Sequence, residues 1–194
     1  MAVTVVDNNI LTNTNNYVLD FQPYQAPANV IPASSWTQIG EQIWSPYMTY
    51  TATDLGTVKT TDLCDGTRYY YSKTDFLKVA DAFPGWHAPT TSDFQYLLDY
   101  CGPSAAYRLK STRYWGTAYG TGSDDFGFNY LPLGKYDDDH TPNAASLNRG
   151  LIWGSTVSST FRDGHVCLDV GSSASKYLIY DYINPYLPLR LVKD

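Results

Sequence analysis

Charged residues, and basic ones in particular, are scarce in this sequence. Only 16% of its 194 residues are charged, too few for a coiled coil or a disordered polyampholyte, so the chain is expected to fold. The 13 basic residues form no cluster and are outnumbered by 19 acidic ones, which gives a net charge of -6. Because this charge repels a phosphate backbone, nucleic-acid binding is disfavoured.

Long apolar runs are missing as well. No stretch approaches the roughly 18 consecutive apolar residues of a membrane-spanning helix, so membrane insertion is not expected. Residues 1–9 also lack the basic region and apolar core of a secretory signal. A chain from which a signal had been removed would look the same.

Cysteine occurs at only three positions, Cys64, Cys101 and Cys167. This odd and widely spaced set fits neither a disulfide-stapled mini-domain nor a zinc site built from paired CxxC units. We expect mainly buried thiols, with a single disulfide as the alternative.

Tyrosine, by contrast, is abundant, with 18 residues. The length suits one domain, with or without an N-terminal arm. Residues 1–68 are rich in Asn, Thr and Pro, which favour turns and short extended segments. We interpret them as an extended, β-rich arm for attachment or oligomerisation, followed by a folded domain over residues 69–194.

Helix signals are clearest at the start of this domain. A capping pattern at residues 72–75 predicts a short helix over 73–82. A second capping box, at residues 90–93, opens another helix that Gly102-Pro103 ends. The apolar residues of this second helix share one face: Phe94, Leu97, Leu98 and Cys101.

Strand patterns dominate after residue 104. Apolar and β-branched runs predict five strands, over residues 128–133, 151–158, 165–170, 176–183 and 187–192. Helices followed by a run of strands indicate an α+β fold, with helices packed on one side of a mostly antiparallel sheet.

One block of the sequence resembles a known family. Residues 85–90 read Gly-Trp-His-Ala-Pro-Thr, similar to the Gly-Trp-His-Leu-Pro-Thr signature of the Fibrobacter succinogenes major paralogous domain. Similar blocks follow in the family's order at residues 109–115, 124–132, 153–156 and 190–194, so the resemblance covers about residues 69–194. We expect structural roles for the residues of these blocks: Gly85, Trp86, His87, Pro89, Thr90 and Trp153.

The resemblance implies a C-type lectin-like domain, in which two helices flank a small twisted sheet and long loops carry ligand contacts. Family members usually carry cysteines where this chain has Ala82-Phe83 and Leu191. If those cysteines form a disulfide, core packing replaces it here, as suits a protein that folds in a reducing cytoplasm.

Two motifs resemble catalytic groups. His87 invites assignment as a base, but no nucleophile and orienting group can be read beside it, so we expect it to form hydrogen bonds near the start of the second helix. Ser155 lacks the G-x-S-x-G elbow of a serine nucleophile, and the family resemblance favours a packed strand with Trp153.

Three neighbouring carboxylates, Asp137, Asp138 and Asp139, form the best metal candidate. Carboxylates are the hard ligands that calcium prefers, but the spacing of an EF-hand and the calcium motifs of lectins are absent. A solvated acidic loop is therefore the favoured interpretation, with Ca²⁺ as the alternative and no other cofactor expected. Asp124-Asp125 is expected to shape a turn.

Aromatic residues near glycine-rich loops are the best candidates for ligand contacts. Tyr119, Tyr136 and Trp115 offer flat faces that stack on sugar rings or add contact area at low entropic cost. The alternative is that they fill the core, which the resemblance favours for Trp115. Tyr71, Tyr130 and Tyr177 are expected to be buried.

Together these features favour a non-catalytic recognition or structural module. Lectin-like domains serve phages as variable binding surfaces, so the fold analogy suggests a virion fibre, tail or capsid-decoration protein that binds a host-surface glycan or protein. The arm would contact other virion proteins and further copies of the chain, for example in a trimer. The alternatives are a secreted or surface adhesin of a bacterium and, remotely, an enzyme of the formylglycine-generating type.

Overall fold

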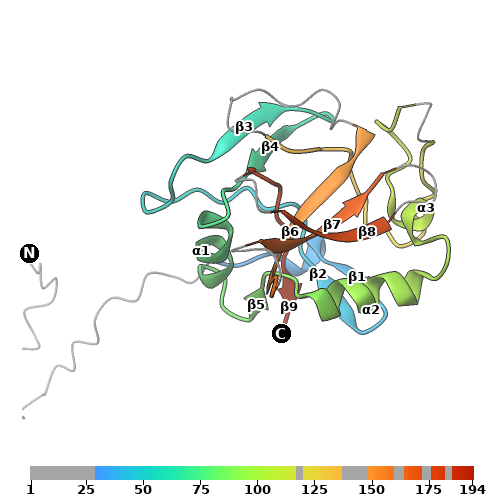
Figure 1. The fold of residues 1–194 in the computed structure, drawn as a ribbon, viewed down its shortest axis with the longest axis horizontal. Helices are drawn as coiled ribbons and strands as arrows, with labels where there is room; N and C mark the ends of the chain where they lie inside the picture. Colours follow the sequence, from blue (N-terminus) through green and yellow to red (C-terminus); the bar gives the residue numbers. More distant parts are fainter. Residues whose placement is uncertain (1–28, 117–119, 137–147, 160–163, 172–175, 182–184) are drawn as a thin grey trace, which may run out of the picture.

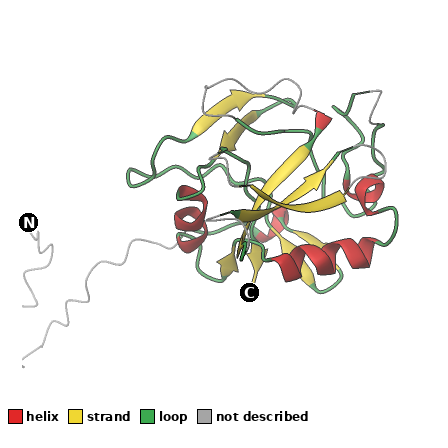
Figure 2. Ribbon diagram, in the orientation of Figure 1, coloured by secondary structure: helices red, strands yellow, loops and turns green. Residues whose placement is uncertain are grey.

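The computed structural model describes residues 29–116, 120–136, 148–159, 164–171, 176–181 and 185–194, and only the backbone of residues 176–181. Three short helices and small antiparallel sheets make up these ranges, which agrees with the predicted α+β class (Figure 2). The helices are α1 (Asp75–Asp81), α2 (Thr91–Cys101) and α3 (Ala105–Leu109). The strands are β1 (Thr37–Ile39), β2 (Gln42–Trp44), β3 (Lys59–Asp62), β4 (Thr67–Tyr70), β5 (Trp86–His87), β6 (Gly150–Val157), β7 (His165–Val170), β8 (Lys176–Asp181) and β9 (Val192–Lys193).

The strands form three separate sheets (Figure 1). One four-stranded sheet has the order β1-β2-β9-β5, so that Val192 lies opposite both Trp44 and His87. A β3–β4 hairpin forms the second sheet, and β6, β7 and β8 form an antiparallel meander. The β1–β2 hairpin and the last strand are therefore held together in one sheet.

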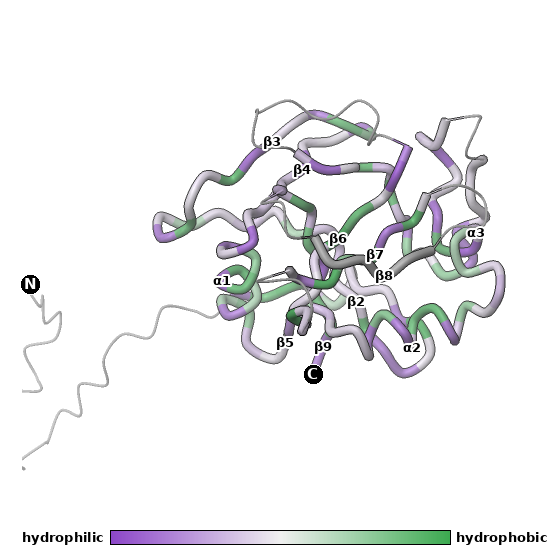
Figure 3. Tube along the Cα trace, viewed as in Figure 1, coloured by the Kyte–Doolittle hydropathy of each residue, from purple (hydrophilic) through white to green (hydrophobic). Residues whose placement is uncertain are grey.

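Helix α2 forms where its capping box and apolar stripe predict it. The Thr90 side chain accepts a hydrogen bond from the Asp93 N–H, and the Asp93 carboxylate accepts one from the Thr90 N–H. Both bonds satisfy donors that a helix start leaves open. Figure 3 shows hydrophobic and hydrophilic residues alternating along the helix, as expected for one buried face.

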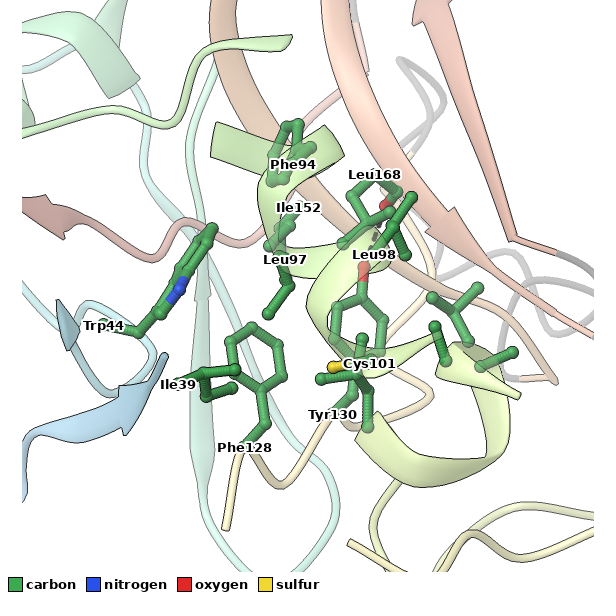
Figure 4. Packing of buried hydrophobic residues seen from close by; sticks show 14 of the residues in the cluster. Ile39, Trp44, Phe94, Leu97, Leu98, Cys101, Phe128, Tyr130, Ile152 and Leu168 are labelled. Carbon is green, nitrogen blue, oxygen red and sulfur yellow. Dashed lines mark hydrogen bonds between the residues drawn. The ribbon is translucent and has the colours of Figure 1, made fainter. Parts of the chain in front are cut away.

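The buried face of α2 anchors the first hydrophobic cluster. All four predicted apolar residues are buried, and Figure 4 shows them in one cluster with Trp44, Phe128 and Tyr130. Trp44 stacks on Phe94 at 6.1 Å between ring centroids and meets Phe128 edge-on at 5.3 Å. Gly154 lets β6 approach this helix, because a Cβ there would lie 2.6 Å from the Phe94 ring.

A second cluster lies under α1. Phe76 stacks on Trp153 at 5.1 Å, and Tyr71 is fully buried beside them, as expected from the sequence. Phe83 and Leu191 both belong to this cluster. They lie at the two positions where the sequence resemblance leads one to expect cysteines, so apolar side chains are packed at both positions.

Some predicted elements differ from the structure. The sequence does not predict the short helix α3, because the pattern after residue 104 indicates strands and loops. Residues 128–133 form only an isolated bridge from Tyr130 to Lys110, since Asn129 has a positive φ of 52° and Pro132 has no N–H. Of residues 187–192, only the last enters a strand, β9.

The boundary expected at residue 69 falls inside the folded unit. Strand β4 crosses it, and Trp44, from the expected arm, is completely buried in the first cluster. Residues 37–68 are thus part of the folded unit, because β2 pairs with β9 and because Leu63 and Cys64 pack against the buried residues Leu131 and Tyr136. Residues 1–28 lie outside the described ranges, so an attachment role remains a prediction for them alone.

Truncation separates these two parts of the expected arm. A chain that begins at residue 29 is expected to unfold cooperatively in urea, with a midpoint close to that of the full chain. A chain that begins at residue 69 loses Trp44 and two strands of the four-stranded sheet, and is expected to show no cooperative transition. Tryptophan fluorescence monitors unfolding in both cases. If the chain that begins at residue 69 unfolded cooperatively, the domain boundary at residue 69 would be supported after all.

Candidate functional site

His87 joins three elements by hydrogen bonds. Its Nδ1 lies 2.6 Å from Oδ1 of Asp194, and its Nε2 lies 3.2 Å from Oδ2 of Asp93, in the first turn of α2. This confirms the expected hydrogen bonding near the start of that helix. Trp86 is half-buried and meets Trp36 edge-on at 5.5 Å, so it lies at the margin of the core and not inside it.

The rest of the Gly-Trp-His block is structural too. The Gly85 carbonyl accepts a hydrogen bond from Asp194 N–H, the Pro89 carbonyl accepts one from Ser155 N–H, and Thr90 caps α2. The Ser155 hydroxyl donates to the Ala88 carbonyl at 2.9 Å. These hydrogen bonds attach the block to β6, and they give Ser155 a structural role.

Trp153 is fully buried, as expected. Its Nε1–H donates to the Tyr71 carbonyl at 2.8 Å, in the centre of the second cluster. Asp124 shapes a turn, also as expected, because its side chain accepts a hydrogen bond from Asn129 N–H at 2.6 Å.

The aromatic ligand candidates lie elsewhere than expected. Trp115 is only 5% exposed and donates its Nε1–H to the Tyr130 carbonyl, so its ring is a core element. Tyr136 is 7% exposed and meets Tyr70 edge-on at 4.8 Å. Both assignments as ligand contacts are wrong, because the rings fill the core. Tyr119 lies outside the described residues.

The acidic run Asp137, Asp138 and Asp139 also lies outside the described residues. Within the described ranges, no group of three or more potential metal ligands comes together. Cys101 and Cys167 are buried in different hydrophobic clusters, as expected for structural thiols. Cys64 is half-buried, and burial raises the pKa of its thiol, which lowers the fraction of reactive thiolate at neutral pH.

A surface pocket of about 270 Å³ gathers polar groups from four distant segments. Its least exposed side chains are Phe128, Leu131 and Arg190, which we take as the floor. Its other lining residues are more exposed: Ser35, Thr37, Pro46, Tyr47, Arg68, Gly127 and Asn129. The short strands β1 and β2 and the segment before β9 place these residues together.

Arg190 is the unusual residue of the floor. It is 2% exposed, and it donates to the carbonyls of Ser45, at 2.7 Å, and Phe128, at 2.5 Å. Its guanidinium lies 3.9 Å from the centre of the Phe128 ring and 5.3 Å from that of Tyr47. Burial lowers the pKa of Arg190 to about 10, so the group remains charged at neutral pH.

A second arginine lines the same pocket. Arg68, on β4, is half-buried and donates to the carbonyls of Leu63 and Cys64. Three other arginines of the described chain, at positions 108, 113 and 149, each pair with a carboxylate. Neither Arg68 nor Arg190 forms an ion pair with a carboxylate of the described residues.

The remaining groups around Arg190 are mostly neutral. Burial raises the pKa of Tyr47 to about 12, so its hydroxyl stays protonated, and it accepts a hydrogen bond from Leu131 N–H. Burial also raises the pKa of Asp124, whose negative charge still acts on Arg190 through space. The pocket is thus positively charged in a protein of net charge -6.

Sequence reasoning did not identify this pocket. Arg190 lies in a block of family resemblance that contains no signal for ligand binding. The one local signal was a charged residue inside the apolar run 187–192, because a charge in such a run is buried only with partners.

Comparison with family models, with curated proteins and with solved structures finds no match in any of the three. The resemblance to the Fibrobacter succinogenes major paralogous domain therefore stays a prediction. None of the helices in the described ranges is long and apolar enough to cross a membrane.

The hydrogen bond between His87 and Asp93 leads us to predict a pH-dependent contribution to the stability of the fold. Burial disfavours the charged form of Asp93, but hydrogen bonds from Thr90 and His87 outweigh it and hold the pKa of this carboxyl below its usual value. Asp93→Asn is expected to destabilise the fold by about 1 kcal/mol at pH 7. This difference should shrink as the pH falls below about 4, where the native carboxylate becomes protonated.

The matched control is Asp99→Asn, at an exposed position of the same helix. Urea unfolding at several pH values measures both variants. A difference between Asp93→Asn and the unchanged chain that stays constant down to pH values of about 2 would contradict the role of the carboxylate charge.

Proposed function

We propose that the protein is a non-catalytic recognition module that binds an anionic ligand in the pocket of Arg68 and Arg190. The observation that carries this proposal is that one surface pocket is lined by two arginines, neither of which is paired with a carboxylate of the described chain. Arginine forks recognise carboxylate and phosphate groups with defined geometry. The pocket therefore suits the binding of an anionic group.

The proposed fold is C-type lectin-like. In support, α1 and α2 lie at different sides of the small sheets (Figure 1). Residues of the segment after β2 and of the loop at Phe128 line the pocket, together with residues of short strands. In such domains, loops held by a rigid scaffold carry the ligand contacts.

The proposed setting is a phage particle, where the protein would be a fibre, tail or capsid decoration that binds a host-surface glycan or protein. Residues 1–28 would attach it to other virion proteins and to further copies of itself, for example in a trimer. A bacterial surface or secreted adhesin is the alternative, and it would use the same pocket.

An enzyme of the formylglycine-generating type is the remote alternative. That chemistry uses paired active-site cysteines. Here Cys101 and Cys167 belong to different clusters, and burial raises the pKa of the Cys64 thiol. The described cysteines thus favour a structural role, and rapid alkylation of one of them in the native protein would support the enzyme.

Immunogold electron microscopy tests the proposed setting. Antibodies raised against residues 29–194 are expected to label intact phage particles at a regular position, in preparations from cells or phage that encode the chain. Pre-immune serum and particles that lack the gene are the controls. Label confined to the bacterial envelope would overturn the virion setting in favour of the adhesin.

A further inference from the structure

We infer that the pocket of Arg68 and Arg190 takes a sugar that carries a carboxylate group. This inference rests on the proposed recognition function, and it names the ligand class of the same site. It follows from the charge, the size and the polar rim of the pocket.

The positive charge of the two arginines favours an anionic ligand. A guanidinium has five N–H donors, and Arg190 and Arg68 each donate two hydrogen bonds, all to backbone carbonyls. Burying a cation without an opposite charge is costly, and in the described chain Arg190 is balanced only by carbonyl dipoles, ring faces and the more distant Asp124. A ligand carboxylate would supply the missing charge to donors that remain.

The geometry favours a carboxylate over a phosphate. Phosphate sites commonly use main-chain N–H groups, but those of Gly127 and Asn129 are both bound by Asp124. A planar carboxylate matches the fork of a guanidinium.

The rim indicates a sugar. Ser35 and Thr37 supply hydroxyl oxygens as acceptors, since each hydroxyl donates to a backbone carbonyl. Asn129 supplies an exposed amide, and Tyr47 supplies part of an aromatic ring. Hydroxyls and amides bind sugar hydroxyls, while aromatic rings pack on the apolar face of the sugar. A volume of about 270 Å³ lies just below the range for drug-sized ligands and suits a single sugar residue.

The adjoining pocket offers room for the next unit of a glycan. It has a volume of about 480 Å³ and shares Ser35, Pro46 and Tyr47 with the first pocket. Its other lining includes the apolar residues Ile31 and Met48. A sugar in the charged pocket can therefore continue along the surface of the protein.

Isothermal titration calorimetry of the full chain tests this assignment. Three probes are compared at constant ionic strength: sodium glucuronate, neutral glucose and inorganic phosphate. Glucuronate is expected to bind at least about tenfold more tightly than either of the others, because only it combines a planar carboxylate with sugar hydroxyls. Its affinity should fall as salt is added.

Two variants locate the binding. Arg68→Gln is expected to weaken glucuronate binding at least about tenfold, whereas Arg113→Gln removes the same charge at an exposed position outside the pocket and should leave it unchanged. Asn129→Gly removes the rim amide and suits the positive φ of 52°, so it is expected to fold and to bind about threefold or more weakly. If Arg68→Gln fails to fold, Asn129→Gly alone tests whether the ligand binds in this pocket.

Tighter binding of phosphate, equal binding of glucose, or unchanged affinity in both pocket variants would overturn the carboxylate-sugar assignment. Absence of heat with all three probes would overturn it as well. None of these results bears on where the protein resides, because immunogold labelling tests the virion setting separately.

Discussion

The buried guanidinium of Arg190 is the interaction on which the rest of the structure depends. It donates to carbonyls after β2 and in the loop at Phe128, and it lies on the Phe128 ring, so one charge connects three distant segments. A cation at 2% exposure is tolerated only when these partners are all in place. The loop, the β1–β2 hairpin and the segment before β9 are therefore expected to form together.

The same constraint places a positive charge beneath the surface pocket. Carbonyl dipoles hold Arg190 without neutralising it, and Arg68 on β4 is held in the same way. The hydrogen bonds of His87 and of the Gly-Trp-His block instead connect α2, β6 and the C-terminal residue. The proposed recognition function thus depends on a group that is also structural.

Local signals in the sequence predicted local structure well. The capping box and apolar stripe of α2 lie within a dozen residues, and the runs that form β6 and β7 have enough β-branched and apolar residues to be recognised. The pairing of β2 with β9 joins very short strands from distant parts of the chain, so no local pattern reveals it. The pocket was missed for the same reason, since its lining residues come from segments far apart in the sequence that no local pattern brings together.

The most direct measurement of the central claim is the free energy of unfolding of Arg190→Met, compared with Arg113→Met. Methionine keeps an apolar stem but leaves the Ser45 and Phe128 carbonyls without their donors, and the expected loss is about 2–4 kcal/mol. The exposed arginine should cost less than about 0.5 kcal/mol. Equal, small losses in both variants, measured by urea unfolding, would contradict the central role of Arg190.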